Sequence, residues 1–212
     1  MPYICAGMKK KPAPEPTEEK ILAAARKVFM RKGYAASRTR DIAEEAGINL
    51  ALLNYYFRSK EKLFEIVMIE NMKHFAGGII HIINDSTTVF DQKIELIAVQ
   101  YIDNLTAMPD LPIFVLSELR NHPDKLIKLI QLDMIFVNSI LFMQYNELVK
   151  KKKVHKMHPI HLLANIVSLC VFPFVSAPLI RSVGSISEKD FMGLMQERKK
   201  LVPQWIKSML YK

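Results

Sequence analysis

The chain has 212 residues, of which 50% are hydrophobic and 24% charged, and its formal net charge is +9. The length allows one large domain or two modest ones, and seven glycines are too few for a loop-rich β protein. Long segments without Pro or Gly, rich in Leu, Ile, Met, Lys and Glu, predict an all-α fold of about nine helices.

The positive charge is concentrated near the N-terminus. Residues 1–60 hold 12 Lys and Arg against 6 Asp and Glu, whereas the remaining residues hold 18 against 15. A basic first third suits a surface that neutralises phosphate groups. A solubility charge with a basic tail would give the same counts, so the counts alone do not decide between the two.

The chain begins with a tail and a first helix. Residues 1–16 contain three lysines followed by alternating prolines, a composition typical of extended, solvated chain. A helix is predicted from Thr17 to Lys32, because Thr17 can cap it, apolar residues recur at helical spacing, and Gly33 ends it.

Residues 39–60 have the pattern of two short helices joined by a tight turn. Thr39 can cap the first helix, and Gly47 follows its last apolar position, where positive φ is common. Asn49 can cap a second helix over residues 50–56. Two short helices joined through a glycine-containing turn form a helix-turn-helix, whose second helix enters the DNA major groove.

An ordinary helical hairpin has the same spacing, so the side chains around the unit matter. Four cations flank its two ends, where phosphates would lie: Arg38, Arg40, Arg58 and Lys60. Tyr55 and Tyr56 are adjacent on a helix too short to bury both. These features favour DNA binding over a plain hairpin.

This stretch closely resembles the DNA-binding signature of TetR-type transcriptional regulators. The agreeing positions are Thr39, Ile42, Ala43, Ala46, Gly47, Ile48, Leu53, Tyr56, Phe57, Ser59, Lys60, Glu61 and Leu63. Two positions depart from the family pattern. Asn49 stands where Ser is usual, which exchanges one helix cap for another, and Asn54 stands where Tyr is common.

The resemblance implies a three-helix DNA-binding domain over residues 17–63 and a helical effector-binding and dimerisation domain over residues 64–212. It implies a homodimeric repressor that binds a palindromic operator in double-stranded DNA, with half-sites about 34–36 Å apart. An unknown small, largely apolar effector would release it by moving the fourth helix.

The resemblance also implies roles for individual residues. Phosphate contacts would come from Thr39, Arg40, Asn49, Tyr56 and Lys60. Base contacts would come from Leu50, Ala51, Leu52, Asn54 and Tyr55. Because an asparagine can bond adenine through two hydrogen bonds, we expect Asn54 to set the sequence preference.

Further helices are predicted downstream. Ser59 would cap a fourth helix that runs to about Ile83 with a kink at Gly77–Gly78. The remaining helices are expected over 88–105, from Pro112 to residue 120, over 124–152, over 159–181 with a bend at Pro173, and over 187–210 with a division at Pro203.

The second domain is expected to hold a cavity and a dimer interface. Helices rich in Met and Phe can enclose an apolar cavity, and the residues expected around it are Met72, Tyr101, Phe114, Met134 and Asn138. The last two helices are unusually apolar for a monomer. Pairing with a second copy would bury Ile166, Cys170, Phe174, Phe191, Leu194, Met195 and Trp205.

Residues 162–180 are 19 residues without a charge, which is long enough for a membrane helix. Asn165, two serines and two prolines favour a buried helix instead. Two scattered cysteines argue against a disulfide framework, and the N-terminus lacks the apolar run of a signal peptide. We therefore expect a cytoplasmic protein without a membrane span.

Other chemistry is sparse. His155, His158 and His161 could suggest a metal, but Pro159 separates them and no Cys or carboxylate joins them. The lysines at 150–153 suit a solvated helix end. The sequence has no catalytic triad, phosphate loop or metal motif, so we expect no cofactor and no enzyme. A helical enzyme or carrier with a vestigial helix-turn-helix is the alternative, and it would need a polar constellation within residues 88–210.

Overall fold

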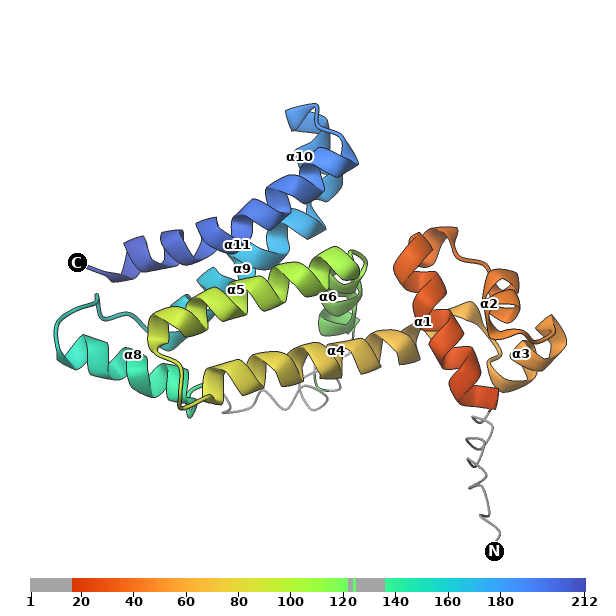
Figure 1. The fold of residues 1–212 in the computed structure, drawn as a ribbon, viewed down its shortest axis with the longest axis horizontal. Helices are drawn as coiled ribbons and strands as arrows, with labels where there is room; N and C mark the ends of the chain where they lie inside the picture. Colours follow the sequence, from red (N-terminus) through yellow and green to blue (C-terminus); the bar gives the residue numbers. More distant parts are fainter. Residues whose placement is uncertain (1–16, 122–123, 125–135) are drawn as a thin grey trace, which may run out of the picture. The chain divides into compact units, whose positions relative to one another are not determined.

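The computed structural model describes residues 17–121, 124 and 136–212. Within them the chain forms ten helices, labelled in Figure 1. In chain order they are α1 (Thr17–Ala36), α2 (Thr39–Ala46), α3 (Leu50–Tyr56), α4 (Lys60–Asn84), α5 (Phe90–Ala107), α6 (Leu111–Asn121), α8 (Ile140–Lys150), α9 (Pro159–Val175), α10 (Ala177–Gly184) and α11 (Glu188–Leu210). The all-α prediction is confirmed. The chain divides into two compact units, one ending at Phe64 and the other beginning at Glu65.

The first unit is built on the apolar faces of α1 to α3. α1 packs against α2, and α2 against α3. The buried side chains come from all three helices and include Ile21, Val28, Ile42, Leu53 and Phe57. Gly33, with φ 70° and ψ 172°, interrupts α1 where the sequence predicted its end, but helical turns continue to Ala36.

The turns of the helix-turn-helix follow the predicted signals with one correction. Thr39 does not cap α2. Arg38 occupies the cap position, and its backbone N–H donates to the Asp41 carboxylate at 3.1 Å. A carboxylate in the first turn is a stronger acceptor than a hydroxyl and is favoured there by the helix dipole. Gly47 ends α2 in the left-handed region, with φ 65° and ψ 35°, as predicted.

Two further predicted caps are confirmed. Asn49 Oδ1 accepts the N–H of Leu52 at 2.8 Å at the start of α3. Ser59 Oγ accepts the N–H of Lys62 at 3.1 Å at the start of α4. Each cap satisfies one amide that the helix itself leaves without an acceptor.

The second unit has α5 at its centre. α11 lies along α5, and α9 packs against both (Figure 1). The main apolar cluster joins α5, α8, α9 and α11 through residues such as Ile94, Leu141, Ile166 and Val202. One lysine is fully buried among these groups. Lys93 donates to the backbone oxygens of Asp85 and Thr88, so its charge is bonded to the α4–α5 connection.

The structure corrects the predicted helix over residues 124–152. Residues 125–135 lie outside the described part, residues 136–138 form a turn, and α8 begins only at Ile140. Ser139 Oγ accepts the N–H of Phe142 at 3.2 Å. This hydroxyl caps a new helix where the apolar periodicity alone suggested a continuous one.

Three predicted interruptions also differ. The bend expected at Pro173 lies at Ser176, between α9 and α10, and measures 69°. Pro178 stands in the first turn of α10, where a proline needs no N–H partner. α4 continues through Gly77–Gly78 and α11 continues through Pro203.

Pro173 therefore lies inside α9 and leaves the carbonyl of Leu169 without its usual i+4 amide donor. Arg198 of α11 supplies a donor, since its Nη2 lies 2.7 Å from that oxygen. The guanidinium also lies 5.0 Å from the centre of the Trp205 ring. One side chain thus compensates for the proline and joins α9 to α11.

No helix within the described residues is, by itself, long and apolar enough to cross a bilayer. α9 and α10 meet the requirement in length and composition only when taken together as a bent pair.

Candidate nucleic-acid interface

α3 has one buried face and one exposed face. Leu53 is 1% exposed, and Phe57, just after the helix, is 4% exposed, so these two side chains anchor α3 to the first unit. Tyr55 is 79% exposed and Tyr56 41%, and their rings meet edge to face at 5.5 Å. The expectation that the helix cannot bury both tyrosines is confirmed.

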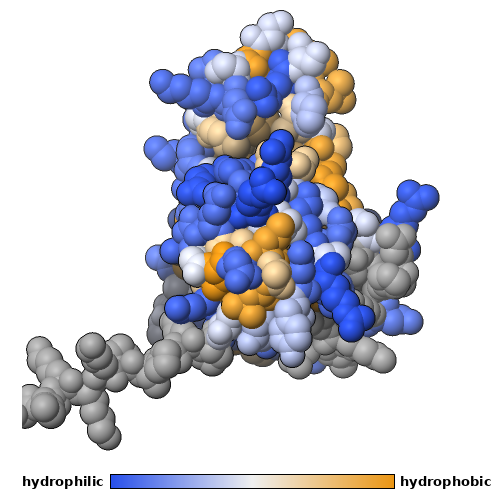
Figure 2. Space-filling model, turned by 90° about the vertical axis from the view of Figure 1, so that its right-hand side faces the viewer, coloured by the Kyte–Doolittle hydropathy of each residue, from blue (hydrophilic) through white to orange (hydrophobic). Residues whose placement is uncertain are grey.

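The exposed face of α3 combines apolar, amide and aromatic groups. Ala51, Leu52 and Asn54 are exposed beside the tyrosines, while Leu50 is half-buried. Figure 2 views the molecule from the side on which α3 lies in Figure 1, and it shows hydrophobic groups surrounded by hydrophilic ones. Methyl, amide and ring groups on one helix face suit the base edges and thymine methyls of a major groove.

Two acidic residues of α2 are paired within the unit. Glu45 lies 3.5 Å from the ammonium of Lys27 and 3.6 Å from the guanidinium of Arg31. Asp41 lies 3.0 Å from Lys32. The hydrogen bonds from Lys32 and from the Arg38 backbone lower the pKa of the Asp41 carboxyl. The lowered pKa keeps the Asp41 carboxyl ionised, and cations of α1 neutralise the charge of both carboxylates.

Three of the predicted phosphate contacts lie at the starts of α2 and α3. Arg40 is exposed on the first turn of α2, and Thr39 beside it is half-buried. Asn49 is exposed and uses its side-chain oxygen as the α3 cap, which leaves its amide NH2 as a donor. Their contacts with DNA stay predictions.

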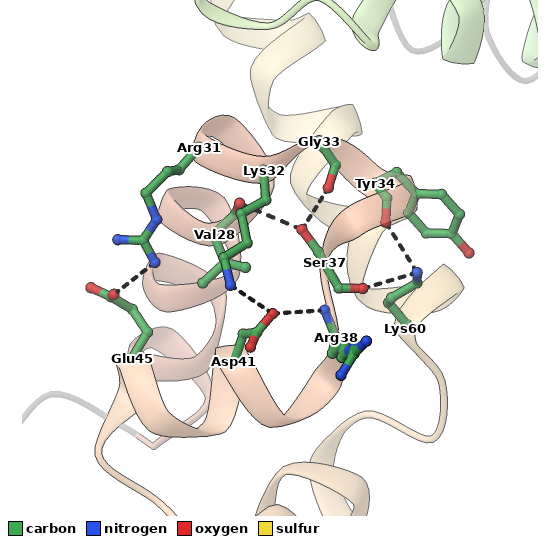
Figure 3. A network of polar contacts seen from close by, with 10 residues as sticks. All are labelled: Val28, Arg31, Lys32, Gly33, Tyr34, Ser37, Arg38, Asp41, Glu45 and Lys60. Atoms are coloured by element: carbon green, nitrogen blue, oxygen red, sulfur yellow. Dashed lines mark hydrogen bonds and ion pairs between the residues drawn. The ribbon is translucent and has the colours of Figure 1, made fainter.

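Lys60 has a different environment from the one predicted. Its ammonium donates to the backbone oxygens of Tyr34 at 3.0 Å and Ser37 at 3.1 Å (Figure 3). It also lies 4.0 Å from the centre of the Tyr34 ring. No pattern in the sequence indicates this arrangement, because it depends on how the end of α1 folds back onto the start of α4.

Comparison with known proteins relates the first unit to a family of regulatory proteins. A family model described as bacterial regulatory proteins of the tetR family matches residues 21–67, which include α2 and α3. The first unit of the chain thus carries a domain of the tetR family. A match to a family of regulatory proteins favours a regulator over the alternative of a helical enzyme.

Two curated relatives are similar to part of the chain. The HTH-type transcriptional repressor KstR2 of Mycolicibacterium smegmatis is 30% identical over 53% of this chain and 61% of its own length. The HTH-type transcriptional repressor NicS of Pseudomonas putida is 30% identical over 51% of this chain and 44% of its own length. The chain thus spans less than two thirds of these curated relatives.

The similarity in fold is more extensive. A TetR transcription regulator from Haloarcula marismortui aligns with 92% of this chain and 98% of its own, with a TM-score of 0.61 and 17% sequence identity. At that identity the likeness concerns the fold, which is of the TetR type in both units.

The residues predicted to surround an effector differ in burial. Met72 is buried, Tyr101 and Phe114 are half-buried, Asn138 is exposed, and Met134 lies outside the described residues. Burial raises the pKa of the Tyr101 phenol. A hollow of about 760 Å³ opens elsewhere in the second unit, between the start of α5, α8 and Tyr211, and none of the predicted residues lines it.

The residues predicted for the dimer interface divide by burial into two groups. The second unit buries five of them in its own core: Ile166, Cys170, Phe174, Phe191 and Met195. Only Leu194, 41% exposed, and Trp205, 38% exposed, are accessible to a second copy. Apolar composition marks both core and interface, so it could not separate the two faces of each helix. Burial also raises the pKa of the Cys170 thiol to about 12.

The histidines do not form a metal site with their surroundings. Within the described part of the chain, no three His, Cys, Asp or Glu side chains gather as ligands. His158 instead caps α9, because its Nδ1 accepts the N–H of Ile160 at 3.3 Å.

Proposed function

We propose that this protein is a transcriptional repressor of the TetR family that binds a palindromic operator as a homodimer and leaves it when a small ligand binds the second unit. The observation that carries the proposal is the exposed face of α3, held in place by Leu53 and Phe57. The relatives KstR2 and NicS are named as transcriptional repressors, which supports the sign of regulation.

In this proposal α3 enters the major groove and reads bases through Asn54 and Tyr55. Asn54 is the strongest candidate for specificity, because its amide can donate to and accept from one adenine. Ala51 and Leu52 would contact thymine methyls. Phosphate contacts from Arg40, beside Thr39, and from Tyr56 would fix the register of the helix on the duplex.

The second copy would pair through exposed faces of α9 and α11. On α9, exposed side chains recur every four residues at Ile160, Ala164, Ser168 and Phe172. On α11, the exposed stripe contains Leu194, Trp205 and Met209. The small Ala164 and Ser168 allow a facing helix to approach closely, and burial of the larger apolar groups would stabilise the dimer.

Release by a ligand requires that the ligand prefer the conformation that does not fit the operator. A ligand with equal affinity for both conformations would shift nothing, however tightly it bound. The apolar core of the second unit suits a largely apolar ligand.

The recognition test uses the DNA upstream of the protein's own gene as a probe. Fluorescence anisotropy should show specific, salt-dependent binding by the wild type. Tyr55→Ala should weaken specific binding by about 5- to 150-fold, since one base contact contributes roughly 1–3 kcal/mol. Its dimer mass, measured by light scattering, should not change. Equal operator affinity for Tyr55→Ala and wild type would refute the assignment of α3 as the recognition helix.

The dimer test compares two equally exposed apolar positions. Phe172, 62% exposed on α9, is replaced by Asp, and Val89, 58% exposed at the start of α5, is replaced by Asp as the control. A charge in the buried interface should leave Phe172→Asp monomeric. Val89→Asp should stay dimeric because Val89 lies outside the proposed interface, and it should stay folded because Asp is a good residue at a helix cap. A dimeric Phe172→Asp protein would place the interface elsewhere.

A further inference from the structure

We propose that Lys60 is a positioning residue of the DNA-binding unit, whose ammonium group joins the end of α1 to the start of α4 and does not contact a DNA phosphate. The inference rests on the proposed DNA-binding function, and it revises the role that the family resemblance implies for this lysine. It follows from the contacts around the ammonium in the first unit.

The ammonium group is already engaged in the protein. Of its three N–H donors, one bonds the Tyr34 oxygen at 3.0 Å and one bonds the Ser37 oxygen at 3.1 Å. The ring of Tyr34, 4.0 Å away, covers another side of the charge. Lys60 is also only partly exposed, unlike Arg40 and Arg58, which are exposed. A phosphate contact would compete with bonds that exist before DNA arrives.

The acceptors are the carbonyls that need such a donor. Tyr34 lies in the last turn of α1, after the break at Gly33, and Ser37 lies in the link to α2. Carbonyls at a helix C-terminus lack intrahelical partners and carry partial negative charge, so a lysine there stabilises them. The contact is therefore the expected use of a cation at this position.

The same link is held from two other sides, as Figure 3 shows. The buried Ser37 donates its hydroxyl to the Gly33 oxygen at 2.5 Å. The next residue, Arg38, is the cap of α2 and is bonded through Asp41 to Lys32. Lys60 thus bonds directly to the residue before the α2 cap, and its loss would free the start of the helix-turn-helix.

The neighbouring residue strengthens the same junction. Tyr34 donates its phenol hydrogen to Glu61 Oε1 at 2.8 Å. Two consecutive residues of α4 therefore bind Tyr34. Lys60 bonds its backbone oxygen, and Glu61 bonds its side-chain hydroxyl. This arrangement fixes α4 to the end of α1 within the unit and so fixes the direction from which α2 and α3 start.

The salt dependence of operator binding separates positioning from phosphate contact. Each phosphate neutralised adds about 0.9 to the slope of log K against log salt. Lys60→Met keeps the apolar stem and removes the charge, and Arg40→Met is the matched control at a predicted phosphate contact. We expect Lys60→Met to lose about tenfold in operator affinity with the wild-type slope, whereas Arg40→Met should lower the slope by about one.

Two measurements on the free protein test the contact without DNA. Hydrogen exchange at the Ser37 and Arg38 amides should become faster in Lys60→Met and stay unchanged in Arg40→Met. In the wild type, acetylation by an N-hydroxysuccinimide ester should be slower at Lys60 than at the exposed Lys20, and added operator should not slow it further. The acetylation experiment uses the wild-type protein, so it tests the position of the Lys60 ammonium even if the Lys60→Met variant folds poorly.

The outcomes distinguish the two levels of the proposal. A slope reduced by one in Lys60→Met, or rapid acetylation of free Lys60 that operator suppresses, would overturn the positioning role. A wild-type protein without specific DNA binding would instead refute the proposed function, and the exchange and acetylation results would still report on the junction.

Discussion

The two units of this protein are stabilised by different kinds of contact. In the first, short helices are fixed by caps, ion pairs and a left-handed glycine, and even the cation at the start of α4 bonds backbone carbonyls. In the second, long helices share one apolar cluster, and side chains such as Arg198 and Lys207 add polar bonds between the helices. The contrast suits the proposed function, in which the first unit presents α3 in one geometry and the second unit accommodates a ligand and a second copy.

The largest effect should come from removing the anchor of α3. Phe57→Ala deletes a side chain that is 4% exposed, and such truncations cost about 3–5 kcal/mol. We expect the first unit to unfold at lower urea and operator binding to be lost.

Trp205 lies in the second unit and is the chain's one tryptophan. Its fluorescence therefore follows that unit, while circular dichroism follows helices in both. In Phe57→Ala the dichroism should show an early transition that the fluorescence lacks. If the fluorescence midpoint shifted as much as the dichroism midpoint, the two units would unfold together, and they could not be treated as separately stabilised.

The next effect tests whether a polar contact in the second unit compensates for a proline. Arg198→Met removes the donor to the Leu169 oxygen, and a hydrogen bond from a charged group contributes about 1.5–3 kcal/mol. In a Pro173→Ala background the helix supplies its own N–H to that oxygen, so the same Arg198→Met change should cost less. Urea unfolding of the four proteins gives the coupling energy. Equal costs in both backgrounds would show that Arg198 acts through its packing on Trp205 alone.

The accuracy of sequence-based prediction follows the same division. The first unit contains local signals at Gly47, Asn49 and Ser59, each of which acts on backbone groups within four residues. Their roles could therefore be predicted from the sequence alone. The break at Ser139 was also a local cap, but the apolar periodicity on both sides obscured it. Signals of this kind reveal where helices begin and end better than they reveal what a helix touches.

Tertiary contacts are the part of the structure that the sequence could not predict. Cys170 and Phe174 share an apolar helix with Phe172, and only the packing of α5 and α11 decides which of them is buried. Nothing in the neighbourhood of Lys60 along the chain indicates that the Tyr34 and Ser37 carbonyls lie beside its ammonium group. These two acceptors lie 26 and 23 positions away from Lys60 in the sequence, so only the folded structure shows the contact.

A smaller effect is expected at the turn between α2 and α3. Gly47 has φ 65°, and a Cβ added there would meet no atom within 4 Å. Gly47→Ala should therefore cost about 1–2 kcal/mol through backbone conformation alone. The loss should appear in the first dichroism transition and leave the Trp205 transition unchanged. Gly47→Asn should lose less, because asparagine tolerates the left-handed region better than alanine.

The smallest effect has the opposite sign and lies in α4 beyond the unit boundary. Gly77 is an exposed helical residue, and a Cβ there also meets no atom within 4 Å. Because alanine loses less conformational freedom in a helix, Gly77→Ala should stabilise the second unit by about 0.5–1 kcal/mol, read from the Trp205 transition. The same substitution would thus act in opposite directions at two equally open glycines, since Gly47 is required by its φ and Gly77 is not. A destabilising Gly77→Ala would indicate that α4 bends there in solution, which would restore the kink expected from the sequence and supply a place where a ligand could act on the helix.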